Sequence, residues 1–224
     1  MDTARIAALL VPFLGRPLPA AALEQISIYI DLLVRWNARI NLTAIRNPDE
    51  IVTRHFGESL FLARQLFLEP KPAYAGADSP AIRVLDIGSG AGFPGLPLKI
   101  WAPEIRLTLI ESNHKKAAFL REVVRTFTLM DVDVISERAE TLAATPAAST
   151  ADVVTLRAVE RFATIIPITV RLLAPAGRLA LLIGSGQTAA LARLAPTLDW
   201  APPVDVPGSN ATVVSIGSRP ESGV

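Results

Sequence analysis

The sequence contains no cysteine and only two histidines among its 224 residues. Without cysteine there can be neither a disulfide nor a thiolate zinc site, and two imidazoles offer few metal ligands. We therefore expect no metal. Stability has to come from a hydrophobic core, which a sequence that is 50% hydrophobic can supply.

Long apolar segments are also missing. Nowhere does the sequence reach the roughly 18 uninterrupted apolar residues that a membrane-spanning helix requires. The apolar stretch Ile6–Leu14 is broken by Pro12 and has no small-residue cleavage site directly after it. We interpret this stretch as a short buried helix and not as a signal segment. We expect a cytoplasmic protein that makes no contact with a membrane.

Lysine is scarce, and arginine carries almost all of the positive charge. The planar guanidinium group suits bidentate contacts with phosphate better than an ammonium group does. Because the formal net charge is only +1, the overall charge does not identify a partner. Local patches of positive charge have to be examined instead.

The N-terminal part of the chain has the pattern of a helical module. Within residues 20–39, apolar side chains recur at the three- and four-residue spacing of one helix face. Asn47 followed by Pro48 and two acids is typical of a helix start. We expect a second helix to run from there through His55 towards Phe67.

A linker is expected after this module. Residues 69–80 are rich in Pro, Ala and Gly and lack periodicity. We place a boundary near Pro80, with the helical module and linker over residues 1–80 and a second domain over residues 81–224.

In the second domain, strand patterns alternate with helical patterns. Strands are expected at residues 82–87, 106–110, 131–136, 152–156, 178–183 and 211–216. Helices are expected after Gly95 and at residues 113–127, 162–173 and 188–194. This alternation predicts an α/β, Rossmann-like fold with a mostly parallel, doubly wound sheet. Three prolines shortly before the last strand indicate a tight connection, so we expect that strand to be an antiparallel edge.

The segment Val84–Gly95 combines a strand of the buried type with a glycine-rich loop. Because glycine lacks a Cβ, such a loop can adopt positive φ and present its amide groups to a ligand at the start of the next helix. A glycine-rich turn alone is weak evidence, but its place between a strand and a helix favours a nucleotide cofactor. We expect Gly88 and Gly90 to bind the cofactor, and we expect Gly90→Val to abolish that binding while the fold survives.

Two acids bear on the identity of the cofactor. The spacing Gly90-x-Gly92-x-x-Gly95 also fits the dinucleotide fingerprint, so NAD and S-adenosylmethionine both remain candidates. Glu111 follows the second strand about 20 residues after the loop, where a carboxylate binds the ribose hydroxyls of either cofactor. Asp86 would attract a methionyl ammonium and repel a pyrophosphate. It could equally cap the loop backbone, and both interpretations stay open.

Candidate ligand-binding residues also follow the third and fourth predicted strands. Ala139 and Glu140 follow the third strand, where folds of this kind build the adenine pocket, although Glu140 could also be a solvated acid at a helix start. Arg157 follows the fourth strand and faces the crevice in which open α/β sheets bind ligands. Its alternative role is a surface arginine lying over the sheet.

Several motifs match one known family: Trp36-Asn37-x-x-Ile40-Asn41-Leu42-Thr43-Ala44-Ile45, Ile51-x-x-Arg54-His55-Phe56-x-x-Ser59-Leu60, the loop Leu85–Gly95, Glu111-Ser112-x-x-Lys115-Lys116-x-x-Phe119-Leu120, and Arg157-Ala158. Over about residues 25–183, the chain resembles the small-subunit (16S) ribosomal RNA guanine-N7 methyltransferases, the RsmG family, also called glucose-inhibited division protein B. The resemblance implies a class I methyltransferase fold, S-adenosylmethionine as cofactor, and 16S ribosomal RNA or the small ribosomal subunit as partner. The cofactor contacts that it implies are Gly88, Phe93, Glu111, Ala139, Glu140 and Arg157.

The sequence departs from the family pattern at three positions. Glu58 stands where the family commonly has Asp, and Leu156 stands where Ser commonly precedes the Arg-Ala pair. Ile183 replaces a lysine after the fifth strand, so we expect a cation to be missing near the catalytic face.

The expected chemistry requires no catalytic acid or base. Guanine N7 carries its own in-plane lone pair, so the enzyme has mainly to orient the base and the methyl donor, an effect worth up to about 7–11 kcal/mol. His55 and Arg157 are candidates for positioning the base. RNA contacts are expected from Arg46, Arg54, His55, Lys115, Lys116, Arg121 and Arg125, together with Arg35 and Arg39.

Two other functions stay open on the sequence alone. An NAD-dependent oxidoreductase would need proton-transfer residues, and the strand ends offer no evident pair. A nucleotide- or RNA-binding module without catalysis is harder to exclude because of Ile183. We expect a monomer.

Overall fold

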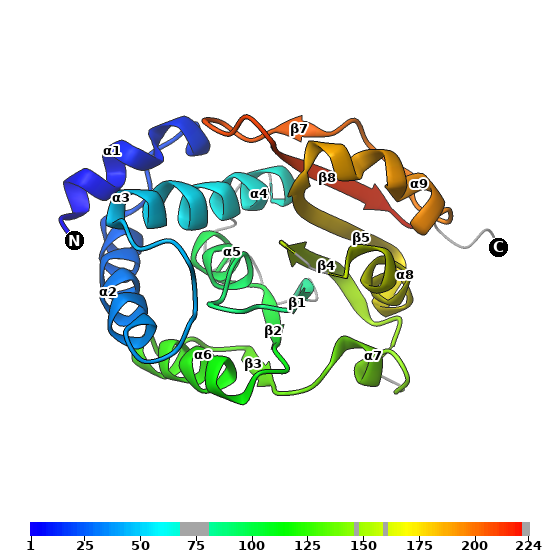
Figure 1. Cartoon of the computed structure of the whole chain (residues 1–224), viewed down its shortest axis with the longest axis horizontal. Helices are drawn as coiled ribbons and strands as arrows, with labels where there is room; N and C mark the ends of the chain where they lie inside the picture. The colour runs from blue at the N-terminus through cyan, green and yellow to red at the C-terminus, as the bar shows by residue number, and fades with distance from the viewer. Residues whose placement is uncertain (68–80, 146–147, 159–160, 221–224) are drawn as a thin grey trace.

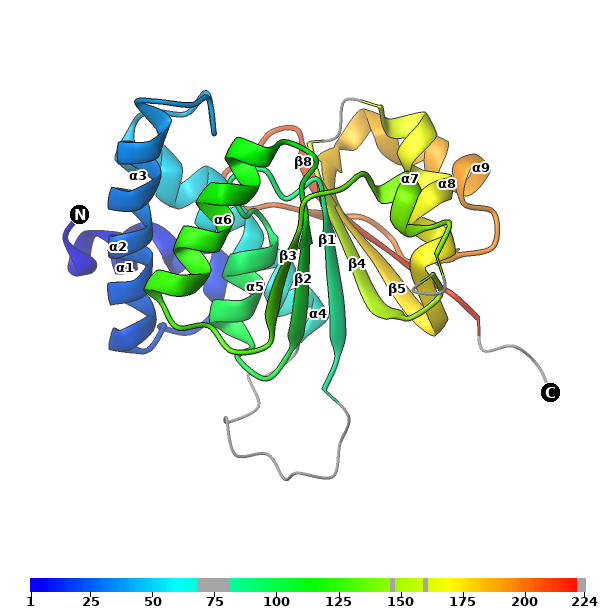
Figure 2. The same cartoon turned by 90° about the horizontal axis from the view of Figure 1, so that it is seen from below.

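The computed structural model describes residues 1–67, 81–145, 148–158 and 161–220. A twisted sheet forms the middle layer of the molecule, and helices cover both of its faces (Figure 1). Helices α1 to α6 lie on one face, and α7, α8 and α9 lie on the other (Figure 2). This arrangement confirms the expected α/β, Rossmann-like fold.

The sheet of the described residues has eight strands. They are β1 (Arg83–Ile87), β2 (Arg106–Ile110), β3 (Val132–Ile135), β4 (Ala151–Arg157), β5 (Leu173–Gly184), β6 (Asp199–Trp200), β7 (Val204–Asp205) and β8 (Thr212–Ser218). Their order is β3-β2-β1-β4-β5-β8-β6, and β1 to β5 are parallel. The order reverses between the neighbours β1 and β4, and open sheets bind ligands at such a point.

The last strand is antiparallel to β5, as expected, but it is not an edge. Both β6 and β7 pair with its outer side. No periodic pattern indicated these two strands, because each is only two residues long. Pro202 and Pro203 lie between them and lack the N–H groups that a longer ladder would need.

Side chains along the parallel strands alternate between the two faces of the sheet, so the hydrophobic core is divided into one cluster on each face. In β5, Ala180 and Leu182 belong to the hydrophobic cluster on the side of the N-terminal helices. Leu179, Leu181 and Ile183 belong to the cluster on the side of α8 and α9. Because successive side chains of a strand point to opposite faces, a strand covered on both sides is apolar throughout.

The helices are α1 (Thr3–Leu14), α2 (Ala20–Asn37), α3 (Pro48–Glu50), α4 (Glu58–Leu66), α5 (Gly95–Trp101), α6 (His114–Thr126), α7 (Ala139–Leu142), α8 (Phe162–Leu172) and α9 (Leu191–Leu194), with a π-helix η1 (Ile51–Gly57) and a 3₁₀ helix η2 (Ser185–Ala190). Helix α2 buries Ile26, Ile30 and Leu33, as its apolar spacing predicts. None of the described helices combines the length and the apolar character that crossing a membrane would demand.

The expected second helix of the module is present, but its winding changes along its length. Asn47 caps it by accepting the amides of Asp49 and Glu50 at 2.9 and 3.4 Å. Helices α3, η1 and α4 then follow without a break. Gly57 ends the π-helical part, and a Cβ there would lie 2.7 Å from the ring of Phe13 in α1. The close approach of α1 therefore depends on this glycine.

The helical module and the sheet share one hydrophobic core. Tyr29 of α2 and Phe56 of η1 belong to the same buried cluster as Val84 of β1. The expected linker at residues 69–80, including the boundary near Pro80, lies outside the described residues, so the division into two domains stays a prediction.

Candidate functional site

A cavity of about 530 Å³ opens at the carboxyl ends of the parallel strands. Ile87, Ile110 and Arg157, the last residues of β1, β2 and β4, line it. Of the residues that the sequence indicated, Gly88, Glu111, Lys116, Ala139, Glu140 and Arg157 line this cavity. Asp86, Gly90, Phe93 and His55 do not.

The glycines of the loop after β1 have two different tasks. Gly88 and Gly90 have φ of +68° and +56°, which favour glycine. A Cβ at Gly88 would meet no atom within 4 Å, and a Cβ at Gly90 would meet only a backbone oxygen at 3.7 Å, so both face open space. A Cβ at Gly92 would instead collide with the Tyr29 hydroxyl, and one at Gly95 would lie 2.7 Å from a carboxylate of β1. The first pair keeps space free, and the second pair permits close packing.

Glu111 connects the two loops that border the cavity. Its Oε2 accepts the amide of Gly90 at 2.9 Å, and its Oε1 accepts the amide of Asn113 at 2.8 Å. The side chain lines the cavity although the residue is only 7% exposed. Each carboxylate oxygen has a second lone pair, so both oxygens can still accept a hydroxyl from a ligand.

Asp86 is fully buried beneath the loop. Its Oδ2 accepts the amide of Gly95 at 3.2 Å, and its Oδ1 accepts the hydroxyl of Thr155 in β4 at 2.8 Å. Burial raises the pKa of Asp86 from 3.8 to about 6, although these hydrogen bonds oppose the shift. Of the two interpretations of Asp86, the cap on the loop backbone is the one for which the structure provides hydrogen bonds.

Ala139 and Glu140 begin α7 and line the far end of the cavity. The Glu140 carboxylate is 40% exposed and lies 3.5 Å from the guanidinium group of Arg161, which also lines the cavity. Arg161 was not predicted because it follows β4 without any recognisable motif.

Phe93 holds the loop against the helical module. Its ring stacks on Tyr29 at a centroid distance of 5.6 Å and on His55 at 4.7 Å. The Tyr29 hydroxyl also donates to the carbonyl of Ala91 at 2.6 Å. The role of Tyr29 was missed, although a phenol on an apolar helix face has to find a hydrogen-bond partner when buried.

His55 is a neutral residue inside this packing. Its Nε2 lies 2.8 Å from Thr43 Oγ1, and its buried Nδ1 has no partner among the described residues. Burial, together with the charges of Arg157 and Arg54, lowers the pKa of His55 to about 3. A neutral imidazole provides no charge for phosphate, so the expected part of His55 in RNA binding lacks an electrostatic basis.

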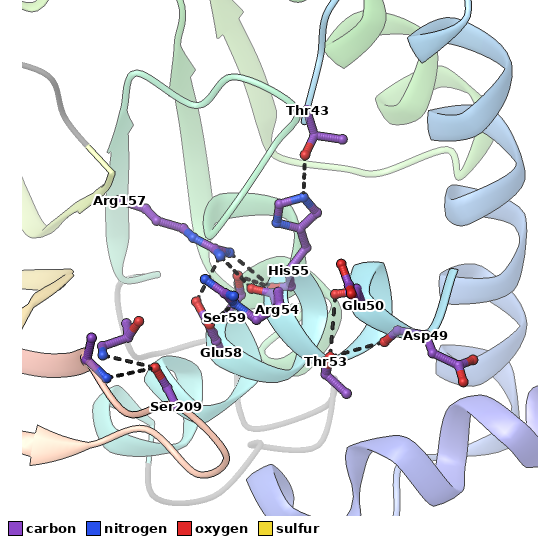
Figure 3. A network of polar contacts seen from close by, with 12 residues as sticks. Thr43, Asp49, Glu50, Thr53, Arg54, His55, Glu58, Ser59, Arg157 and Ser209 are labelled. Atoms are coloured by element: carbon purple, nitrogen blue, oxygen red, sulfur yellow. Dashed lines mark hydrogen bonds and ion pairs between the residues drawn. The ribbon is translucent and has the colours of Figure 1, made fainter. Parts of the chain in front are cut away.

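A buried ion-pair network joins the cavity to the helical module (Figure 3). Arg157 reaches from the end of β4 to η1, where it donates to the backbone carbonyls of Arg54 and His55 and pairs with Glu58 at 2.8 Å. Glu58 also pairs with Arg54 at 2.9 Å. The Glu58 side chain is 3% exposed and that of Arg157 is 13% exposed. Arg157 is thus held below the mouth of the cavity and is not a free surface arginine.

The arginines and lysines that we expected to contact RNA lie in separate parts of the structure. Arg39, Arg46, Lys115 and Lys116 line one cleft between α2 and α6. Arg121 lies further along α6 and donates to the carbonyl of Val134 at 3.2 Å. Arg54 is engaged by Glu58, so it is only partly available to RNA.

Two departures from the family pattern are explained by burial. Leu156 is 0% exposed in β4, and Ile183 is 4% exposed in β5. Both belong to the hydrophobic cluster on the side of α8 and α9. The Ile183 side chain therefore packs in the core and does not line the cavity.

Comparison with known proteins identifies the family. The family model described as "GidB: rRNA small subunit methyltransferase G" matches residues 22–198. The chain is 42% identical over 202 residues to "Ribosomal RNA small subunit methyltransferase G" of Roseiflexus castenholzii, covering 87% of this chain and 82% of that protein. It is 40% identical over 196 residues to the protein of the same name from Xanthomonas axonopodis pv. citri, covering 87% and 85%. The chain belongs to the rRNA small subunit methyltransferase G family.

Solved structures give the same fold. The chain is similar to P. horikoshii TYW2 in complex with MeSAdo, with a TM-score of 0.58 and 14% identity over 81% of this chain and 66% of that one. It is also similar to M. jannaschii TYW2 in complex with AdoMet, with a TM-score of 0.57 and 16% identity over 81% and 78%.

Family membership confirms the enzyme class expected from the sequence, an S-adenosylmethionine-dependent methyltransferase of small-subunit ribosomal RNA. The family match does not support the alternative of an NAD-dependent oxidoreductase.

Proposed function

We propose that this member of the rRNA small subunit methyltransferase G family transfers the methyl group of S-adenosylmethionine to N7 of a guanine in 16S ribosomal RNA. The observation that carries the proposal is the cavity at the switch point of the sheet, bordered by the open backbone of Gly88 and the carboxylate of Glu111. An anionic group at this position and a glycine that leaves space for backbone contact suit an adenosyl cofactor.

The residues that line the cavity fit S-adenosylmethionine. Glu111 would accept the ribose hydroxyls with its free lone pairs, and the backbone at Ala139 together with Glu140 would meet the adenine. Gly88 would lie against the cofactor because a Cβ there would point into open space. S-adenosylmethionine, when bound, supplies a methyl group on a positively charged sulfur atom.

The glycine-rich loop would contact the cofactor, and its conformation is held by Asp86, Gly90 and Phe93. Asp86 and Glu111 fix the two ends of the loop by hydrogen bonds to Gly95 and Gly90. Phe93 anchors its middle to the helical module. A loop held at three places is preorganised, so little of the binding free energy is lost in ordering it.

The absence of an imidazole from the cavity lining agrees with attack by N7. Neither histidine of the chain lines the cavity, and Asp86 is buried beneath the loop. Guanine N7 uses its own lone pair and releases no proton, so the protein has only to hold the base in line with the methyl group and keep water out. Arg157 and the neutral His55 would position the surrounding structure and would transfer no proton.

The enzyme would act as a monomer in the cytoplasm, where its ribosomal substrate is made.

Nucleoside analysis tests this function. Purified protein is incubated with S-adenosylmethionine and 16S ribosomal RNA, and the digested RNA is analysed by mass spectrometry. The expected product is 7-methylguanosine, and Glu111→Gln should form less of it. Methylation of another base or at another atom would contradict the proposal, as would tighter binding of NAD than of S-adenosylmethionine in a calorimetric titration.

A further inference from the structure

A second cavity, of about 410 Å³, lies between the helical module and α6. One wall is the turn after α2 with Arg39 and the following loop with Arg46, and the other wall is the first turn of α6 with Lys115 and Lys116. The two halves of this basic cleft are more than 60 residues apart in the sequence.

The basic cleft holds four cations without a counterion. The described residues that line it include no aspartate or glutamate. None of the ion pairs found in the described parts of the chain involves Arg39, Arg46, Lys115 or Lys116. Six other arginines of the described residues do have an acidic partner, as Arg54 has in Glu58. Four like charges around one concave surface repel each other, and a bound anion would relieve that repulsion.

Both walls of the basic cleft are held in place. The buried Asn37 accepts the amides of Leu42 and Thr43 at 2.9 and 3.1 Å and donates to the carbonyl of Thr43 at 2.9 Å, which fixes the loop. The rings of Trp36 in α2 and Phe119 in α6 meet edge to face at 5.7 Å. The distance between the walls is therefore set by packing and not by the mobile side chains of the cations.

The basic cleft is directly connected to the cofactor cavity. Lys116 lines both. Asn113, which caps α6 and also lines the basic cleft, donates its own amide to Glu111 at 2.8 Å. A ligand in the cleft is thus held at a fixed position relative to the carboxylate expected to bind the ribose of the cofactor.

We propose that the basic cleft binds the sugar-phosphate backbone of the substrate RNA beside the target guanine. This inference rests on the proposed function and adds the face on which the RNA docks. Arginine and lysine side chains without acidic partners are the groups that neutralise RNA phosphates. The amides of Lys115 and Lys116 already donate to Asn113, so the contacts would come from the side chains. Continuity with the cofactor cavity favours a long anion that extends from one site into the other.

Salt dependence of RNA binding tests the inference. The test variant is Arg46→Gln combined with Lys115→Gln, because these residues line the basic cleft and not the cofactor cavity. The matched control, Arg16→Gln with Arg193→Gln, removes the same charge from exposed positions after α1 and on α9, and neither arginine has an acidic partner among the described residues. Affinity for a 16S ribosomal RNA transcript is measured between 50 and 200 mM salt, about the range over which phosphate contacts are readily resolved. Affinity for S-adenosylmethionine and thermal unfolding are measured alongside.

The test variant should bind RNA at least about tenfold more weakly at physiological salt. Its slope of log affinity against log salt should fall by about 1.4, since each contact on single-stranded RNA contributes about 0.7. Its affinity for S-adenosylmethionine should stay unchanged, and the control should keep the slope of the unmodified protein. An unchanged slope in the test variant, or an equal loss in the control, would overturn the inference.

A third variant separates the basic cleft from the other candidate face. Arg121→Gln with Arg125→Gln removes two exposed charges further along α6. If the slope of log affinity against log salt falls in this variant and not in the test variant, the RNA docks on the part of α6 that carries Arg121 and Arg125. The inference is then wrong. Failure of the proposed function gives a different result, because the unmodified protein would then form no 7-methylguanosine while salt-dependent binding could still be measured.

Discussion

The buried ion pair between Glu58 and Arg157 allows a quantitative prediction. The Glu58 side chain is 3% exposed, and its carboxylate lies 2.8 Å from the guanidinium group of Arg157 and 2.9 Å from that of Arg54. The substitution Glu58→Gln keeps the size of this side chain but removes its charge. One amide oxygen can still accept a hydrogen bond, whereas the amide nitrogen would face the second guanidinium group. Burial already lowers the pKa of Arg157, and the charge of Glu58 opposes that shift. The substitution therefore leaves a buried cation without its counterion.

Removing one partner of a buried ion pair lowers the free energy of unfolding by about 3–5 kcal/mol. Arg157 keeps the carbonyls of Arg54 and His55 as acceptors, so we expect the lower end, about 3 kcal/mol. For a chain of this length, that loss lowers Tm by about 6–12 °C. The control is Asp152→Asn, the same chemical change in an exposed pair whose side chains are 50% and 38% exposed, and it should cost less than about 1 kcal/mol.

Chemical denaturation of both variants measures these losses. Arg157→Met provides a second comparison, because Glu58→Gln should cost less in that background if Glu58 acts through Arg157. The reasoning would be refuted if Glu58→Gln destabilised the protein no more than Asp152→Asn does.

Three further predictions concern the loop and its acids. Gly88→Val should abolish binding of S-adenosylmethionine in calorimetry while the protein still folds, because a Cβ there meets no atom within 4 Å and the cost is only the strain of a side chain at φ +68°. Gly92→Ala should lower Tm further, because its Cβ combines a positive φ with a collision in the core. The reverse outcome would show that the two glycines were assigned the wrong tasks. Glu111→Gln should weaken cofactor binding about ten- to a hundredfold, as expected for loss of charge-assisted hydrogen bonds worth roughly 1.5–3 kcal/mol, and unchanged affinity would exclude a ribose contact. Asp86 has its pKa raised to about 6 in the folded state, so its contribution to stability is present in full below about pH 4 and is lost as the pH rises through 6. Stability is measured by chemical denaturation of both proteins at pH 4.5 and 7.5. Relative to the unmodified protein, Asp86→Asn should be more stable at pH 7.5 than at pH 4.5 by up to about 2 kcal/mol, and a constant difference would contradict the shift.

Local patterns in the sequence predicted most of the fold. Strand β2 begins and ends at the predicted residues, β1 begins one residue later than predicted, and α6 is one residue shorter than predicted at each end. The glycine loop, the cap at Asn47 and the acid Glu111 could also be placed, because periodicity, glycine conformation and capping depend on residues that are close together in the chain. The edge position of β8 was predicted wrongly, since two-residue strands leave no periodic signal.

The roles within the site depended on contacts between distant residues. Glu58 and Arg157 are 99 positions apart, and Tyr29 and Ala91 are 62 apart. No pattern in the sequence indicates that η1 presents its carbonyls to the end of β4, because that contact depends on the way the helical module packs on the sheet.

The sequence by itself determined the family, the order of the longer strands and helices, and part of the lining of the cavity, including Gly88, Glu111 and Arg157. Only the tertiary structure decided that Asp86 lies beneath the loop, that His55 is neutral, and that Arg39 and Arg46 face Lys115 and Lys116 across one cleft. The physical reason is that the charge state of a side chain depends on its burial, and that the cleft depends on the packing of α2 against α6. Both are set by the whole core and not by neighbouring residues in the chain.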